Sequence, residues 1–270
     1  MHSFSKTRIA PTPSGFLHAG NAFNFLRTAA LAQQSGARVL LRIDDMDRDR
    51  YRPAYVNDIF ETLDFLGIRW QEGPQHIDDF DRTWSQRHRH HLYLQALERL
   101  KQQQLVFACT CSRPQSAACT CLQKSLPLDT PGASWRLLTD DSPVEVKTVD
   151  GKIITAPLPP EMACFAVRRK DALPAYQLCS VVDDLHFGID LIVRGADLWP
   201  CTLAQHFLAR QLGEASFSRI CFHHHTLLTN EKGEKLSKSA GAYSVKQWRE
   251  SGRPLATYVQ YLNTLLPKIK

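Results

Sequence analysis

Apolar positions along this 270-residue chain follow two different periods. Stretches that repeat them at helical spacing predict helices at 22–35, 54–66, 81–103 and 199–212. Short apolar runs predict buried strands, of the kind found in parallel sheets, at 7–10, 38–43, 189–193 and 219–222. Strands that alternate with helices in this way indicate an α/β fold built on a parallel sheet.

Residues 7–21, TRIAPTPSGFLHAGN, change from strand to helix within a few positions. Two prolines and a Ser-Gly pair end the strand and supply a turn, after which a helix opens near Leu17. His18 and Asn21 are three residues apart in the first helical turn and therefore face the same way. The N-terminus of a helix suits a phosphate chain, and Gly20 lets a flat ligand approach the backbone closely.

A polar loop at 233–241, GEKLSKSAG, carries charge of the sign that phosphates need. Lys235 and Lys238 suit a clamp on phosphates, because lysine is a compact point charge with three donors. Taken singly, a His-x-Gly tripeptide is more often a loop accident, and a Lys/Ser loop is more often solvated surface. Found together in this order, within α/β patterning, the two stretches favour a phosphate site.

An acidic run, DDMDRDR, follows the predicted strand 38–43 at its carboxyl end, where open α/β sheets place their ligands. Asp44, the first of these acids, is suited to hold the α-ammonium group of an amino acid. The alternative is an acid at the N-terminus of the next helix, stabilised by the helix dipole. That alternative is our interpretation for most of the remaining acids, Asp45, Asp47 and Asp49.

Two arginines, Arg8 and Arg194, leave the ends of predicted strands toward one crevice. A planar guanidinium binds a carboxylate through two parallel hydrogen bonds, so the pair suits a substrate with a side-chain carboxylate. The alternative for each arginine alone is a salt bridge that holds strand ends together.

Residues 106–164 read as an insertion into the nucleotide-binding fold. Its cysteines have the spacing C-x-C-x7-C-x-C, which can close a tetrahedral Zn²⁺ site; they are Cys109, Cys111, Cys119 and Cys121. The alternative is a reduced cluster without metal. Alternation in 144–155 predicts a β-hairpin with a two-residue turn at Asp150-Gly151.

Composition and charge limit the class of protein and the kinds of partner to be expected. Hydrophobic residues are 43% and charged residues 22%, as in an ordinary globular protein, and no apolar run is long enough to span a membrane. The chain shows no signal peptide, so we expect a cytoplasmic protein with its cysteines reduced or bound to metal. Net charge is +6, and 235–270 holds seven Lys/Arg against one acid, which fits an RNA partner or else a solvated, charged helix.

Two histidine-rich runs carry no ligand spacing of their own. The run at 87–91 is read as mostly solvent-facing, with His91 as the candidate for a substrate contact. The run at 223–225 is too crowded for a metal site, and one of its three histidines is expected to touch adenine.

The paired stretches resemble the HIGH and KMSKS motifs of class I aminoacyl-tRNA synthetases. RIAPTPSGFLHAGN, RIDDMDRDR, YQLCSVVDD, LIVRGADL and KLSKS are similar to the glutamyl branch, in its order, from about residue 6 to 241. The resemblance implies a Rossmann-like α/β catalytic domain with an inserted zinc-binding, acceptor-type subdomain. It implies ATP with Mg²⁺, zinc, L-glutamate and a tRNA as ligands, with catalysis by His18, Asn21, Lys235 and Lys238.

The same resemblance implies individual roles. ATP contacts fall to His18, Gly20 and Lys238, and glutamate contacts to Arg8, Thr12, Asp44, Tyr176 and Arg194. Asp44 stands where this branch usually has Glu, although Arg194 favours glutamate over glutamine. For zinc only Cys109 and Cys111 carry over, because Trp135 stands where a later cysteine ligand is expected and no matching tyrosine is present.

Four segments follow from this reading: 1–105 and 165–241 as the halves of the nucleotide-binding fold, 106–164 as the insertion, and 242–270 as a basic helical end. The residues after Gly241 are too few for an anticodon-binding domain. The chain therefore resembles the short glutamyl-Q tRNA(Asp) synthetases, which form glutamyl-adenylate and attach glutamate to queuosine of tRNA(Asp). Alternatives are a truncated enzyme that charges a tRNA 3′ end, an amino-acid ligase with another acceptor, and a non-catalytic RNA-binding module. We expect a monomer.

Overall fold

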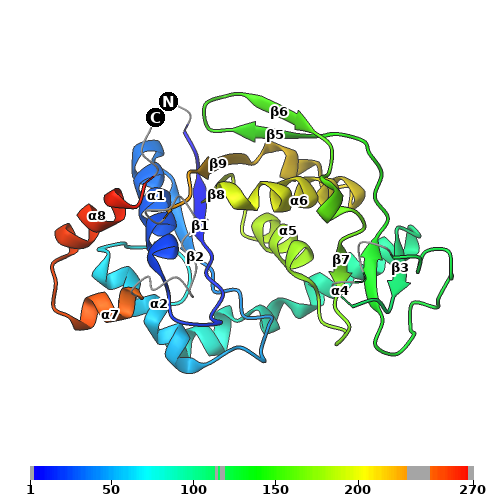
Figure 1. The fold of residues 1–270 in the computed structure, drawn as a ribbon, viewed down its shortest axis with the longest axis horizontal. Coiled ribbons are helices and arrows are strands. Elements are labelled where there is room, and N and C mark those ends of the chain that lie inside the picture. The colour runs from blue at the N-terminus through cyan, green and yellow to red at the C-terminus, as the bar shows by residue number, and fades with distance from the viewer. Residues whose placement is uncertain (1–2, 113–114, 116–118, 230–243, 267–270) are drawn as a thin grey trace. The chain divides into compact units, whose positions relative to one another are not determined.

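The computed structural model describes residues 3–112, 115, 119–229 and 244–266. The chain forms two compact units, each discontinuous in sequence (Figure 1). The first contains residues 1–88, 190–197 and 222–270, and the second contains 89–189 and 198–221. The four segments proposed from the motifs remain a prediction.

A sheet with parallel strands forms the centre of the first unit. Its neighbouring strands are, in order, β2 (Arg38–Leu41), β1 (Lys6–Ile9), β8 (Leu191–Gly195) and β9 (Cys221–His225). Strand β1 runs parallel to both of its neighbours, with Arg8 opposite Leu40 and Thr7 opposite Leu191. The α/β class is therefore confirmed, and each of the four predicted strands is present, although β8 and β9 both begin two residues later than predicted.

Helices of the first unit bury their apolar faces against this sheet and against one another (Figure 1). They are α1 (Ala19–Ser35), α2 (Pro53–Phe65), the short α3 (Ile77–Asp79), α7 (Val245–Glu250) and α8 (Leu255–Thr264). Helix α1 packs on β1, β2 and β8. The shared core includes Phe25 of α1 and Tyr258 of α8, whose side chains are fully buried.

The single helix predicted over 81–103 is wrong. A π-helical turn spans Phe80–Trp84, a 3₁₀ turn spans Gln86–Arg89, and α4 begins only at His90 and ends at Gln102. The N–H of Ser85 bonds to the carbonyl of Phe80, five residues back, at 2.9 Å. Both Ser85 and the next residue then turn toward Asp45, so a distant carboxylate interrupts the helical hydrogen bonding.

Among its described residues, the second unit combines three helices with a three-stranded antiparallel sheet and a β-hairpin. Its helices are α4, α5 (Tyr176–His186) and α6 (Trp199–Gln211). Short 3₁₀ turns lie at Pro160–Met162, Ala196–Leu198 and Ala215–Arg219. One sheet has the order β3 (Val106–Cys109), β4 (Ser134–Leu137) and β7 (Ala166–Arg168). Helix 199–212 was thus predicted to within one residue at its end.

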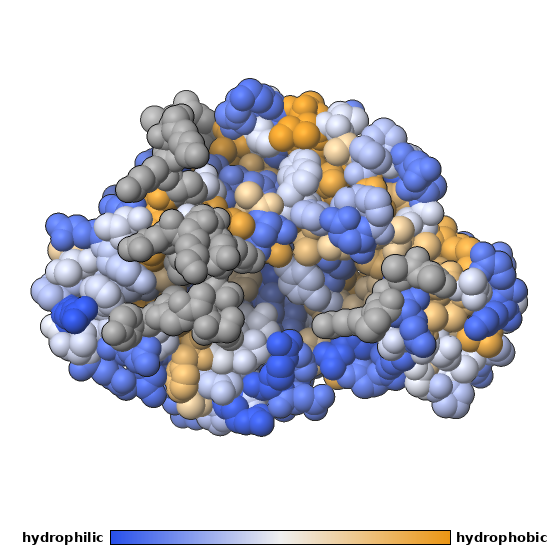
Figure 2. Space-filling view, viewed as in Figure 1, coloured by the Kyte–Doolittle hydropathy of each residue, from blue (hydrophilic) through white to orange (hydrophobic). Residues whose placement is uncertain are grey.

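The predicted hairpin exists as β5 (Val144–Thr148) and β6 (Ile153–Ala156), but its turn is longer than two residues. Thr148 donates its N–H to the carbonyl of Lys152 at 2.9 Å, which leaves 149–151 as a three-residue loop. Gly151 has φ 81°, the left-handed position that such loops require. Figure 2 shows apolar residues gathered over β6, where Ile153 is 56% exposed.

Among the described residues, no helix is both long and apolar enough to cross a membrane.

Candidate active site and cysteine cluster

The start of α1 is built around His18, which is its N-cap. The imidazole Nδ1 accepts a hydrogen bond from the N–H of Gly20 at 3.1 Å. In return, the side-chain oxygen of Asn21 accepts from the N–H of His18 at 3.1 Å. This reciprocal capping box satisfies two of the N–H groups that a helix start leaves unpaired. Because Nδ1 is an acceptor here, the proton of the neutral ring lies on Nε2.

Gly20 has a reason to be glycine that the sequence did not reveal. A Cβ at this position would lie 3.0 Å from His18 Cε1 and 3.1 Å from Nδ1. Those separations are shorter than ordinary carbon contacts, which begin near 3.5 Å. The missing side chain therefore makes room for the imidazole over the first helical turn.

A buried carboxylate binds the backbone just before α1. Asp58 of α2 accepts a hydrogen bond from the N–H of Leu17 at 2.8 Å and is only 2% exposed. Its other oxygen binds Arg249 of α7 at 3.0 Å. Residue 244 also pairs with His18, and Val245 donates its N–H to the carbonyl of Leu17 at 3.0 Å. The start of α1 is thus joined to the chain that follows residue 243, while Lys235 and Lys238 lie outside the described residues.

Arg8 and Arg194 share one face of the parallel sheet. Thr7 lies opposite Leu191, so residues at odd offsets from this pair, such as Arg8 and Arg194, point to the same side. Both are buried, at 6% and 3% exposed. Strand β8 runs one residue beyond Arg194, which therefore lies inside the strand rather than after it.

Asp44 reaches the same face with an arginine that sequence reasoning missed. The backbone pairing of β1 and β2 continues beyond the strands, since Arg42 donates to the carbonyl of Ile9 and Asp44 to that of Pro11, both at 2.9 Å. Arg42 binds Asp44 through two hydrogen bonds, Nε to Oδ1 at 2.8 Å and Nη2 to Oδ2 at 3.1 Å. The alternation of polar residues at positions 42 and 44 was the signal that could have predicted this pair.

One histidine of the 223–225 run belongs with these residues. His224 stacks on Phe222 with the ring planes 8° apart, and the guanidinium of Arg194 lies 5.4 Å from the centre of the same Phe222 ring. Burial, followed by the positive charge of Arg194, lowers the pKa of His224 to about 4. We call Arg8, Arg42, Asp44, Arg194 and His224 the arginine face.

His225 has a structural role instead. It is buried, and its two ring nitrogens lie 3.0 Å from the side-chain oxygen of Asn24 and 3.0 Å from the carbonyl of Thr226. It also packs edge-on against Phe23 of α1. Alternation along β9 therefore places His225 and His224 on opposite sides of the strand, and the adenine contact of one histidine stays a prediction.

Two other predicted glutamate contacts lie at exposed positions. Thr12 is exposed in the turn before α1, where its carbonyl accepts a hydrogen bond from the N–H of Ser14 at 2.9 Å. Tyr176 is the first residue of α5 in the second unit and is 47% exposed. Both roles stay predictions.

The four predicted metal-ligating cysteines of the second unit converge. Their sulfur atoms all lie within 4.8 Å of one another, although residues 109 and 121 are twelve positions apart. Three of the S···S distances are 3.5, 3.7 and 3.5 Å. Tetrahedral Zn–S bonds of about 2.3 Å would place the sulfurs roughly 3.8 Å apart, so this set has the size of a zinc site.

Hydrogen bonding within the cluster shifts the pKa values of two of the thiols in opposite directions. The backbone N–H of Thr110 is the main cause that lowers the pKa of Cys121 to about 6. Hydrogen bonding to Cys121 is the main cause that raises the pKa of Cys111 to about 12. The thiolate form is thus favoured at Cys121 and disfavoured at Cys111, a difference that a bound divalent cation would remove because it binds thiolates.

Two arginines have internal partners that the sequence did not reveal. Arg249, within the basic segment 235–270, is bound to Asp58 and to Thr62, the latter at 2.8 Å. The run 87–91 is mostly exposed as predicted, but its Arg89 is buried and pairs with Asp183 at 2.9 Å. Charge alone could not separate these internal partners from surface charges.

The fold and these residues define a class of protein. The chain belongs to the class I tRNA synthetases (E and Q), whose catalytic domain matches residues 5–117 and 138–266. A glutamate tRNA ligase from Elizabethkingia meningosepticum has the same fold, with a TM-score of 0.74 at 20% identity over 96% of this chain and 60% of that one. The fold class, the ligase type and the family expected from the motifs are therefore confirmed, and members of this class use ATP with Mg²⁺.

Curated relatives lie within the glutamate branch. A glutamyl-Q tRNA(Asp) synthetase from Nitratidesulfovibrio vulgaris is 33% identical over 279 residues, which cover 96% of this chain and 85% of the relative. One from Symbiobacterium thermophilum is 34% identical over 278 residues, covering 94% and 84%. Glutamate–tRNA ligase 2 from Acidiphilium cryptum is 36% identical over 280 residues, and the chain spans only 61% of that protein.

Proposed function

We propose that this protein activates L-glutamate with ATP and transfers it to the queuosine base of tRNA(Asp). The observation that carries the proposal is the arginine face, in which Arg8 and Arg194 place buried guanidiniums on neighbouring parallel strands of a class I synthetase sheet. A guanidinium pairs with a carboxylate through a fork of two hydrogen bonds. Glutamate differs from most amino acids by its second carboxylate, which such a face would select.

Glutamate binding divides among groups of opposite charge. Arg8 and Arg194 take the side-chain carboxylate, with Thr12 as a further contact, and the role of Tyr176 rests on the resemblance of its motif alone. Asp44 takes the α-ammonium group, and Arg42 keeps the Asp44 carboxylate oriented through its two hydrogen bonds. Aspartate at position 44 is one methylene shorter than the usual glutamate, and an arginine that holds it in place offsets the lost reach.

Activation requires positioning and charge neutralisation more than covalent chemistry. The α-carboxylate of glutamate attacks the α-phosphorus of ATP in line, the bond to the bridging oxygen breaks, and pyrophosphate leaves. His18 donates from Nε2 toward the phosphates, since its Nδ1 is occupied as the N-cap acceptor. Asn21 acts through His18 by fixing its backbone. Gly20 admits ATP to the start of α1, Lys235 and Lys238 bind the phosphates, and Mg²⁺ accompanies ATP.

Transfer completes the reaction when a hydroxyl of queuosine attacks the acyl carbon of glutamyl-adenylate and AMP leaves. The acceptor is supported by the similarity to the glutamyl-Q tRNA(Asp) synthetases, of which this chain covers 85% and 84%. A structural zinc at Cys109, Cys111, Cys119 and Cys121 would hold the segments around it together. ATP and tRNA are cytoplasmic substrates, so we expect a cytoplasmic enzyme. We also expect it to act as a monomer.

A second candidate is transfer of glutamate to the 3′ end of a tRNA. The similarity to glutamate–tRNA ligase 2 favours it, because that relative is 36% identical, although the match covers only 61% of its length.

Glutamate-dependent exchange of pyrophosphate into ATP, measured without tRNA and with glutamine and aspartate in parallel, tests the proposal. Exchange with glutamate alone, followed by charging of queuosine-containing tRNA(Asp), is the expected result. Exchange that appears only after tRNA is added would favour charging at a 3′ end. No exchange under any condition would leave a non-catalytic RNA-binding module.

A further inference from the structure

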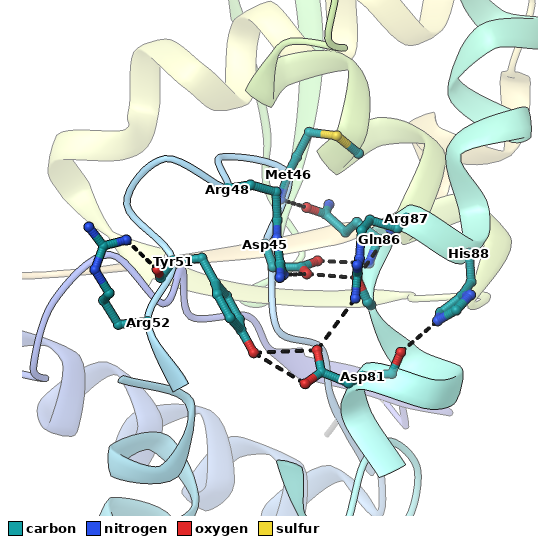
Figure 3. Close-up of polar contacts among 10 residues, drawn as sticks. Asp45, Met46, Arg48, Tyr51, Arg52, Asp81, Gln86, Arg87 and His88 are labelled. Carbon is teal, nitrogen blue, oxygen red and sulfur yellow. Dashed lines mark hydrogen bonds and ion pairs between the residues drawn. The ribbon is translucent and has the colours of Figure 1, made fainter. Parts of the chain in front are cut away.

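A closed circuit of side chains joins the acidic run after β2 to the irregular segment at 80–88 (Figure 3). Asp45 binds Arg48, the guanidinium of Arg48 lies 3.6 Å from the centre of the Tyr51 ring, and the Tyr51 hydroxyl donates to Asp81 at 3.3 Å. The circuit closes through Arg87, which lies 3.5 Å from Asp81 and 3.1 Å from the Ser85 hydroxyl. Ser85 in turn donates to Asp45.

Asp45 is the buried member of this circuit, with 0% exposed surface. Its oxygens accept from the hydroxyl of Ser85 at 2.7 Å, the N–H of Gln86 at 2.8 Å and Nη1 of Arg48 at 2.7 Å. Three donors around one carboxylate suit an ionised group, and removing the charge would leave buried donors without an equivalent acceptor.

Backbone hydrogen bonds also hold the residues on both sides of Asp45. On one side the N–H of Asp44 bonds to the carbonyl of Pro11 at 2.9 Å. On the other side the N–H of Met46 bonds to the side-chain oxygen of Gln86 at 2.8 Å, as Figure 3 shows. Three consecutive residues are therefore held, Asp44 by the segment at Pro11, and Asp45 and Met46 by the segment at 85–86, where the buried carboxylate of Asp45 accepts.

We propose that Asp45 is a positioning residue for the amino-acid substrate, because its buried carboxylate fixes the segment that presents Asp44. This inference rests on the proposed function, in which Asp44 binds the ammonium group of glutamate. Asp45 does not touch substrate; it acts through the adjacent residue. A shift of about 1 Å in such a contact reduces catalytic efficiency roughly 100-fold, so a smaller relaxation should reduce it about tenfold.

The test compares two charge-removing substitutions in the same acidic run. Asp45→Asn keeps the shape of the side chain but turns one acceptor oxygen into a donor that faces other donors. Asp47→Asn is the matched control, since it removes a charge from the same acidic run at a residue that pairs with the exposed Arg50 at 2.6 Å. In pyrophosphate exchange, we expect Asp45→Asn to raise the KM for glutamate about tenfold while the KM for ATP stays within twofold. Asp47→Asn should change neither.

Further substitutions separate positioning from a loss of folding. Ser85→Ala removes one bond to Asp45 and should raise the KM for glutamate in the same direction but less, and Ser85→Thr should restore it. A protein that merely unfolded would lose ATP and glutamate binding together, with a lower fraction of active enzyme and unchanged KM values.

Each outcome decides a different point. Equal KM values for glutamate in Asp45→Asn and Asp47→Asn, or parallel changes for both substrates, would overturn the positioning role while the proposed function stands. An unaltered chain that gives no exchange, with or without tRNA, would overturn the proposed function and this inference with it.

Discussion

Replacing Gly20 by alanine should separate activity from stability at the start of α1. The added Cβ would lie 3.0 Å from Cε1 and 3.1 Å from Nδ1 of His18, so the imidazole must move by a few tenths of an ångström. The helix itself tolerates the change, because alanine is favoured over glycine by up to about 1 kcal/mol in a helix. That gain and the crowding have opposite signs, so the melting temperature should change by only a few degrees.

Activity should respond more strongly. A displacement of roughly a third of the 1 Å that reduces rates about 100-fold predicts a fall in kcat of about three- to tenfold, or about 0.7–1.4 kcal/mol in the barrier. The assay is glutamate-dependent pyrophosphate exchange beside a thermal melt. Ser35→Ala is the control, because it changes the far end of α1, where Ser35 bonds to the carbonyl of Leu31.

Two results would refute this reasoning. Unchanged kcat in Gly20→Ala would mean that the imidazole position does not matter for activation. A large fall in melting temperature together with lost activity would mean that the glycine serves folding rather than the placement of His18.

Further substitutions test other parts of the structure. Arg194→Ala should weaken glutamate binding by about 2–5 kcal/mol, seen as a higher KM for glutamate at a constant KM for ATP. The pKa of His224 is lowered to about 4, so the unfolded chain binds a proton that the folded chain does not between pH 6.5 and 4. Stability should therefore fall as the pH drops through that range, and less so in His224→Phe, as pH-dependent melts would show. A chelator or Cys121→Ser should remove one zinc per chain and lower the melting temperature, measured by elemental analysis and melting. Asp58→Asn should cost about 1–3 kcal/mol in the free energy of unfolding, measured by denaturant titration, because the N–H of Leu17 and the guanidinium of Arg249 share this buried carboxylate, while Glu61 still pairs with Arg249.

Local patterns predicted much of this protein. Helices α1, α2 and α6 and the strands of the parallel sheet follow from periodicity and from nearby prolines and glycines, because those signals act over one or two turns. The cysteine spacing likewise predicted the cluster, since the residues that form it are close in sequence and their sulfur atoms lie within 4.8 Å. The motif order predicted the family, which the comparison confirms.

Tertiary contacts decided what those patterns could not. The helix predicted over 81–103 breaks because Asp45, forty positions from Ser85, binds its hydroxyl and the next N–H. Asp45 itself was read as a helix-terminal acid, and Arg249 as part of a basic surface, since charge in a sequence does not reveal its partner. The residues by themselves determined which strands, helices and reactive groups this chain contains. Only the folded structure decided which charges are buried together, because burial makes an unpaired charge costly and so selects partners that lie far apart along the chain.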